Sequence, residues 1–448
     1  MKKNKKFIYL TQLCLLTGMP LFGFIGQSKA QEVITIQQAI DSTLKNNLQI
    51  KQAQFNYALS DENLKQSKNA LLPTLNANSG FNKNFGRSID PSTNQYISQQ
   101  FNSINGNLSA GLDLFSGWQK LNQIKQNKLL LDVDKTNVDK VKNDLILQVV
   151  TAYMQVLYNK DLLKVAKDQL DVAKQQLNQQ QQLLEVGNKT LADISQAKSQ
   201  VATSELNVTN AENNLNISFL SLTQLMEKPA SYTFEVQAPL VDQLAVLNTY
   251  SANEVYNTAA SNFPDVKLAS FRTLAAAKAI DIAKGSYFPR LSMGGGLGSN
   301  YSSSFTTQSF SSQIKDNFGQ YVGLSLSVPI FNGFNARSSV RKARISYENT
   351  RIQEQLTKNN LNKIIHQAVA DLKAAESRFA STKNAFDAQK DAFYVIDQRY
   401  QVGLVNSLDY STALTNKNKA ETDMIQAKYD LLFKAKVIDY YLGKQIVF

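Results

Sequence analysis

The longest predicted helix lies in residues 117–185, which read GWQKLNQIKQNKLLLDVDKTNVDKVKNDLILQVVTAYMQVLYNKDLLKVAKDQLDVAKQQLNQQQQLLE. The segment contains no proline, and its only glycine is its first residue. Apolar residues recur at steps of three, four or seven, as at Val149, Ala152, Val156 and Leu163, which is coiled-coil spacing. At about 1.5 Å per residue, an unbroken helix of this length spans roughly 100 Å. The pattern therefore predicts an elongated, mainly helical protein.

This helix is expected to end at Val186-Gly187, because glycine readily takes the left-handed conformation that follows a helix. A second helix is predicted to return through residues 190–226, so that residues 117–226 form a long helical hairpin. The same pattern recurs in residues 333–442, with its own Val402-Gly403 turn. The chain is thus predicted to contain two long helical hairpins.

The second half of the chain repeats the first at a constant offset of 216 residues. Leu72-Pro73-Thr74-Leu75 is matched by Phe288-Pro289-Arg290-Leu291, and Leu114-Phe115-Ser116-Gly117-Trp118 by Ile330-Phe331-Asn332-Gly333-Phe334. We take residues 31–232 and 249–448 as two structural repeats joined by a linker at residues 233–248. A unit of this length indicates a duplicated half-protein and not a solenoid array.

Each repeat also contains a predicted β-hairpin, at residues 73–116 and 289–332. After Pro73 the residues alternate between a mostly apolar set, which includes Leu75 and Ala77, and a polar set, which includes Asn76 and Asn78. Strands of about 10–13 residues with this alternation suit a tilted strand that faces lipid on one side and a lumen on the other. A soluble sandwich could show similar alternation, but four strands offer no second sheet to pack on.

Four strands cannot close a transmembrane barrel, because known barrels begin at about eight strands. We therefore expect several chains to share one barrel. The polar loops at residues 86–100 and 299–313 would then face the cell exterior.

The N-terminus has the features of a signal peptide at residues 1–30. Four lysines precede an apolar stretch from Phe7 to Ile25, and Ser28-Lys29-Ala30 has the small residues of a cleavage site. An uncleaved membrane anchor is the rival interpretation. Removing these residues and their five lysines would lower the net charge from +12 to +7 and remove Cys14, the only cysteine. The remaining lysines are spread among acids and amides, which favours a solvated helix surface over nucleic-acid binding.

Nothing in the sequence indicates an enzyme, a cofactor or a metal site. The only histidine, His366, lies in the middle of a predicted helix with no catalytic or metal partner at recognisable spacing. No phosphate-binding glycine loop is present, and Gly294-Gly295-Gly296 falls in a predicted strand.

The duplicated halves, two strand hairpins and two helical hairpins with Val-Gly tips together resemble the TolC family of outer-membrane efflux proteins. The resemblance covers nearly all of the chain after residue 30, and its most specific parts are residues 186–193 and 400–409. It implies a homotrimer with a twelve-stranded barrel in the outer-membrane lipid and a helical tunnel across the periplasm. It also implies passive conduction for an efflux or type I secretion system, with an inner-membrane pump coupled through a periplasmic adaptor.

The resemblance places two kinds of functional residue at the helical tips. Residues Val186, Gly187, Val402, Gly403 and Leu404 match the contacts to the adaptor, although a helix cap alone would also explain each glycine. Residues Asp193, Asp409 and Tyr400 match the constriction or gate, where carboxylates related by threefold symmetry would raise one another's pKa.

The sequence departs from the family pattern at two gate positions. Thr412 stands where a second acidic residue is expected, and Val405 where an arginine is expected. A solvated carboxylate at the start of a helix is an alternative role for Asp193. For the whole chain, an exported coiled-coil structural or adhesion protein without a pore is the alternative function.

Overall fold

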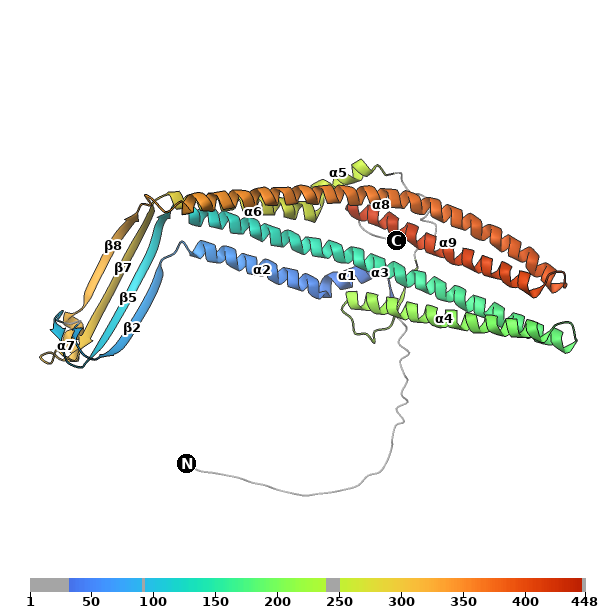
Figure 1. Ribbon diagram of the computed structural model, residues 1–448, viewed down its shortest axis with the longest axis horizontal. Coiled ribbons are helices and arrows are strands. Elements are labelled where there is room, and N and C mark those ends of the chain that lie inside the picture. Colours follow the sequence, from blue (N-terminus) through green and yellow to red (C-terminus); the bar gives the residue numbers. More distant parts are fainter. Residues whose placement is uncertain (1–31, 91–92, 239–249, 445–448) are drawn as a thin grey trace, which may run out of the picture.

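The computed structural model describes residues 32–90, 93–238 and 250–444. The predicted signal peptide at residues 1–30 and most of the predicted linker at residues 233–248 lie outside these ranges. Within them the protein is an elongated helical body with a four-stranded sheet at one end (Figure 1). The expectation of a mainly helical protein with a β part is therefore confirmed.

Two long helical hairpins form most of the body. Helix α3 (Gln119–Glu185) is followed by α4 (Leu191–Leu225), and α8 (Asn335–Gln401) is followed by α9 (Ser407–Tyr441). α3 and α8 have 67 residues each, whereas α4 and α9 have 35 each. Both hairpins have their tips at the end of the molecule opposite the sheet (Figure 1).

Shorter helices complete the body beside α3 and α8. In the first half these are α1 (Ile36–Asn46) and α2 (Leu48–Asn69), and in the second half α5 (Ala252–Asn262) and α6 (Pro264–Lys284). A 3-10 turn, η2 (Gly285–Tyr287), follows α6. α2 packs on α3, α3 on α6, and α6 on α8, so the four helices nearest the sheet form a single layer. All these helices begin 216 residues apart between the halves, the offset found in the sequence.

The sheet contains the strands predicted from the alternating residues, in the order β2-β5-β7-β8 with every pair antiparallel. These strands are β2 (Thr74–Asn84), β5 (Phe101–Ser116), β7 (Arg290–Ser302) and β8 (Gly319–Ser327). The register places Leu75, Ala110, Gly295 and Val322 on one face, and Thr74, Gly111, Gly294 and Gly323 on the other. The first face is mainly apolar along its length, and its Leu75 and Val322 are 69% and 76% exposed. β8 ends before Ile330, which the sequence placed in a strand, because Pro329 cannot donate a ladder hydrogen bond.

The predicted outer loops contain short elements of their own. The first loop holds β3 (Ser88–Ile89) paired with β4 (Tyr96–Ile97), and the second holds α7 (Phe310–Asp316). The range 299–313 expected for the second loop was wrong at both ends, since β7 runs to Ser302 and β8 begins only at Gly319. A capped helix forms there because the Ser309 side chain accepts a hydrogen bond from the Ser312 N–H.

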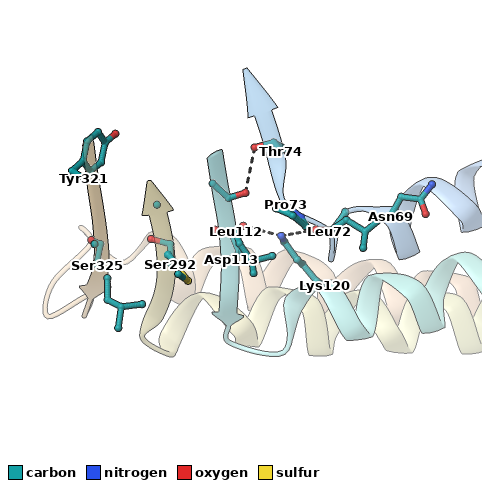
Figure 2. A pocket seen from close by; sticks show the side chains of 16 residues that line it. Asn69, Leu72, Pro73, Thr74, Leu112, Asp113, Lys120, Ser292, Tyr321 and Ser325 are labelled. Carbon is teal, nitrogen blue, oxygen red and sulfur yellow. Dashed lines mark hydrogen bonds and ion pairs between the residues drawn. The ribbon is translucent and has the colours of Figure 1, made fainter. Parts of the chain in front are cut away.

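The joint between sheet and helices is held by Lys120, in the first turn of α3. Its Nζ lies 2.9 Å from Oδ2 of Asp113 on β5 and donates to the carbonyl oxygen of Ala70, which ends α2, at 2.6 Å (Figure 2). Asp113 pairs in register with Ser292 on the polar face of the sheet. One lysine thus connects the ends of α2, α3 and β5 on the polar side of the joint.

The main core lies at the middle of the body. Strand β1 (Glu32–Ile34) pairs in parallel with β6 (Phe234–Val236), which falls in the segment predicted as a linker. The buried Tyr153 hydroxyl lies 2.9 Å from the carbonyl oxygens of both Ile34 and Gln237, which fixes this small sheet against α3. In the described part of the chain, no helix is both long enough and apolar enough to cross a membrane.

Candidate functional site

The first tip joins α3 to α4 through a turn centred on Gly187. The backbone φ of Gly187 is +77°, a conformation that costs a residue with a side chain roughly 1–2 kcal/mol. Thr190 caps α4: its Oγ1 accepts from the Asp193 N–H at 3.3 Å, and Asp193 Oδ2 accepts from the Thr190 N–H at 3.0 Å. This reciprocal capping box makes Asp193 a structural part of the turn.

The second tip joins α8 to α9 with the same backbone but different side chains. Gly403 has a φ of +75°, and Asn406 caps α9 by accepting from the Asp409 N–H at 2.8 Å. The Asp409 side chain is exposed and has no hydrogen bond or ion pair with any described residue. Thr412, one turn further along, is exposed and donates its hydroxyl to the Leu408 carbonyl oxygen at 2.9 Å. Of the two equivalent aspartates, Asp409 is therefore the one whose carboxylate is free to face a neighbour or a solute.

One hydrogen bond ties the two tips to each other. Ser407 Oγ, at the start of α9, donates to Asp193 Oδ1 at 2.7 Å. This bond, together with those from the Thr190 N–H and hydroxyl, lowers the pKa of Asp193 to about 2. Within a single chain Asp193 is thus held as a carboxylate, opposite to the raised pKa expected for neighbouring carboxylates in a ring.

Tyr400 lies between the two hairpins and is 7% exposed. Its hydroxyl accepts a hydrogen bond from Nε2 of the buried Gln180 on α3, and its ring centroid lies 4.5 Å from that of Tyr410 on α9. Lys189 Nζ lies 5.0 Å from the ring centroid of Tyr400. Burial raises the pKa of Tyr410 above its usual range. Tyr400 therefore connects α3, α8 and α9 just behind the turns.

Both tips expose large apolar side chains on their outer surface. Val186, Val402 and Leu404, predicted to contact an adaptor, are 68%, 70% and 71% exposed. Two residues that the sequence reasoning missed belong to the same surface: Leu191 and Leu408 are 74% and 68% exposed. The sequence could have indicated them, because each is an apolar residue in the first turn of a helix, α4 or α9. At that position it does not reach the apolar contact between the two helices of its hairpin.

The structure places the remaining singled-out residues away from the tips. His366 is exposed in the middle of α8, and Gly294-Gly295-Gly296 lies in β7. No group of histidine, cysteine or acidic side chains in the described ranges could hold a metal ion.

Comparisons with known proteins cover both halves of the chain. The model of the family described as outer membrane efflux protein matches residues 39–227 and again residues 255–444. Outer membrane protein TolC of Escherichia coli (strain K12) is 24% identical, over 96% of this chain and 86% of that protein. Outer membrane efflux protein BepC of Brucella suis biovar 1 is 21% identical, over 93% of this chain and 86% of that protein.

Solved structures show the same fold. The Campylobacter jejuni CmeC outer membrane channel superposes with a TM-score of 0.79 at 17% identity, covering 91% of this chain and 85% of that one. The open state of the Neisseria gonorrhoeae MtrE outer membrane channel gives a TM-score of 0.75 at 18% identity, covering 91% and 89%.

Long helical hairpins joined to a small sheet are the fold that this chain shares with these outer membrane channels. The chain belongs to the outer membrane efflux protein family, because the family model matches both of its halves. It is an outer-membrane duct of tripartite efflux, and its family is one of channels and not of enzymes. The resemblance, localisation and class of function inferred from the sequence are thereby confirmed.

Proposed function

We propose that three copies of this chain form one duct, with a shared twelve-stranded barrel and a helical tunnel that narrows at the tips. The supporting observation is the four-stranded sheet. Its outer strands β2 and β8 each have one partner within the described chain, and its apolar face is exposed. Open edges of this kind pair with another chain, and an apolar outer face suits lipid.

The mass of the particle in mild detergent tests this arrangement. With a chain of 49.9 kDa, a trimer has three times that mass, about 150 kDa before any processing. Native mass spectrometry of protein extracted from the membrane fraction should give that trimer. Monomer in the soluble periplasmic fraction would instead favour the pore-free coiled-coil protein.

We infer that the exposed apolar surface of the tips contacts a periplasmic adaptor, which couples the duct to an inner-membrane pump. Val186, Gly187, Val402, Gly403 and Leu404 form this surface together with Leu191 and Leu408. Exposed apolar side chains at the far end of a soluble helical body are favourable sites for protein contact. Substituting Leu404 and Leu408 by Ser should weaken adaptor binding to the trimer, whereas the same change at Ile345 and Ile352, exposed on α8 far from the tips, should not.

We further propose that Asp409, Tyr400, Asp193 and Thr412 form the constriction. The free carboxylate of Asp409, repeated three times around an axis, would make a negative ring that favours cations. Tyr400 and Asp193 would act differently, by holding the two hairpins together through Gln180 and Ser407.

Single-channel recording of Asp409→Ala in planar bilayers tests the ring. We expect higher conductance, or weaker block by multivalent cations, than in the unchanged protein. Thr412→Ala, one turn further along α9, changes a neighbouring constriction residue without a change of charge and should have the smaller effect. Unchanged conductance and block in Asp409→Ala would remove Asp409 from the constriction.

A further inference from the structure

A row of basic side chains follows the junction between sheet and helices in both halves of the chain. The first acidic residue of α3 is Asp132 and that of α8 is Glu348, each the fourteenth residue of its helix. Before them, α3 carries Lys120, Lys125 and Lys128, and α8 carries Arg337, Arg341, Lys342 and Arg344. Seven basic residues and no acid therefore occupy the first turns of the two helices.

Four of these residues occur at equivalent positions in the two halves, and we name them the basic collar: Lys125, Lys128, Arg341 and Arg344. Lys125 corresponds to Arg341 and Lys128 to Arg344 at the 216-residue offset. All four are exposed, and none forms an ion pair with any residue the structure describes. Lys120 differs, because it is held by Asp113 and Ala70 at the joint.

The collar residues of α3, Lys125 and Lys128, lie on the side of the helix that faces neither neighbour, and Arg341 and Arg344 occupy the equivalent positions on α8. On α3, Gln119 and Gln126 donate to carbonyl oxygens of α6, whereas Lys120 and Asn127 donate to carbonyl oxygens of α2. At about 100° per residue, Lys125 and Lys128 lie about 240° and 180° around the helix from Gln119, away from both neighbours. In a closed ring of helices this side faces outward.

The collar also lies at a defined depth below a belt of exposed aromatic residues. Trp118 and Phe334 immediately precede α3 and α8 and are 56% and 61% exposed, and Phe331 is 76% exposed. Lys125 and Arg341 come seven residues later, roughly 10 Å along the helix axis. Aromatic belts mark the membrane interface, and the headgroup layer adds roughly 5–8 Å beyond the hydrocarbon.

Side-chain direction brings the charges closer to the membrane. Cα–Cβ bonds in a helix tilt toward its N-terminus, which for α3 and α8 is the end next to the sheet (Figure 1). Long basic side chains can extend further in that direction, as they do when they snorkel to an interface. With the sheet in the bilayer as proposed, the side chains of Lys125 and Arg341 would extend toward the headgroup layer.

We propose that the basic collar binds the phosphate groups of anionic phospholipids in the periplasmic leaflet of the outer membrane. This inference rests on the proposed placement of the sheet in the bilayer. Clusters of lysine and arginine next to a membrane-embedded segment attract anionic headgroups, at roughly a fivefold preference for each basic side chain near the surface. The collar would fix the depth of the duct and select the lipids around it.

Tryptophan quenching can test the proposal, because Trp118 is the only tryptophan of the chain. The trimer is reconstituted in phosphatidylcholine vesicles that contain increasing fractions of brominated phosphatidylglycerol or brominated phosphatidylcholine. Quenching by both lipids reports that Trp118 lies in the bilayer, and the ratio of the two curves gives the headgroup preference. We expect a preference for phosphatidylglycerol of roughly fivefold or more that decreases as salt is raised.

The variant K125Q/R341Q should lower this preference several-fold, because it removes two of the four collar charges. The matched control K135Q/R351Q removes two charges from the same faces of α3 and α8. These positions lie seventeen residues beyond Trp118 and Phe334, roughly 25 Å along the helix axis. The control should keep the preference of the unchanged protein.

Three outcomes would contradict the account, and they differ in what they overturn. Absence of quenching by either lipid would overturn the membrane placement together with the collar. Quenching without headgroup preference would overturn the collar alone and leave an acidic protein partner as its occupant. Equal loss of preference in K125Q/R341Q and K135Q/R351Q would show that net charge, and not the collar, attracts the lipid.

Discussion

The two helical tips have the same backbone conformation but differ in the side chains packed behind their turns. Position for position at the 216-residue offset, Tyr400 and Tyr410 in the second tip replace Leu184 and Ile194 in the first. The second tip consequently has an aromatic cluster of its own, in which Tyr400, Tyr410 and Leu414 are buried. The first tip depends on the second, since Gln180 and Asp193 take their partners from α8 and α9. Duplication preserved the turn, whereas the contacts that join the hairpins became specific to each half.

The largest difference between the tips should appear when their interior residues are truncated. Tyr400→Ala removes a buried ring and leaves the buried Gln180 amide without its partner, which costs about 3 kcal/mol or more. Leu184→Ala at the equivalent, half-buried position should cost about half as much. Hydrogen exchange at the amides next to each turn measures both costs. Equal costs at the two positions would contradict the asymmetry.

The two equivalent aspartates should also differ in what they contribute to stability. Asp193→Ala removes the capping box and the bond from Ser407, so the first tip should lose about 1–2 kcal/mol of local stability. Asp409→Ala leaves the Asn406 cap in place and should cost less than about 0.5 kcal/mol. Exchange protection of the first turns of α4 and α9 gives the comparison. A larger loss in α9 would reverse our assignment of the structural and the free carboxylate.

The smallest predicted effect is a dependence on pH that is confined to the first tip. The pKa of Asp193 is lowered to about 2 by Ser407 and Thr190, compared with an ordinary value of 3.8. Its stabilisation is therefore fully present above about pH 4 and is lost as the pH falls toward 2. Asn406, which caps the second tip, does not titrate. Exchange protection corrected for intrinsic rates should fall in the first turn of α4 between pH 5 and 2 more than in that of α9.

Much of the fold was predictable because it follows from local periodicity. Absence of proline and glycine over residues 118–185 and 334–401 predicted the long helices, and two-residue alternation predicted the strands. The pairing of β1 with β6 was missed, because a parallel pair of three-residue strands has almost no signal in the sequence. The helix α7 was missed for a similar reason, since seven polar and apolar residues show no clear period.

The candidate site was less predictable than the fold. Gly187, Gly403 and the tip residues could be located, since a turn needs glycine in the left-handed conformation. The bond from Ser407 to Asp193 and that from Gln180 to Tyr400 join residues more than 200 positions apart, and their side chains have no distinctive spacing. The collar was also missed, because its lysines and arginines resemble an ordinary solvated helix surface in the sequence. Their position became apparent only when the structure showed that α3 and α8 begin directly after the exposed aromatic residues.

The most direct measurement of the proposal that the bond between Ser407 and Asp193 holds the constriction narrow is the conductance of D193C/S407C in planar bilayers. Cys14 is replaced by Ser in the variant and in the control S407C, so that one disulfide can form between the contacting positions. Oxidised D193C/S407C should conduct no more than the unchanged protein, and reduction should raise its conductance, whereas S407C should not respond to reduction. Identical conductance in the oxidised and reduced states, with the disulfide verified by mass, would contradict the account.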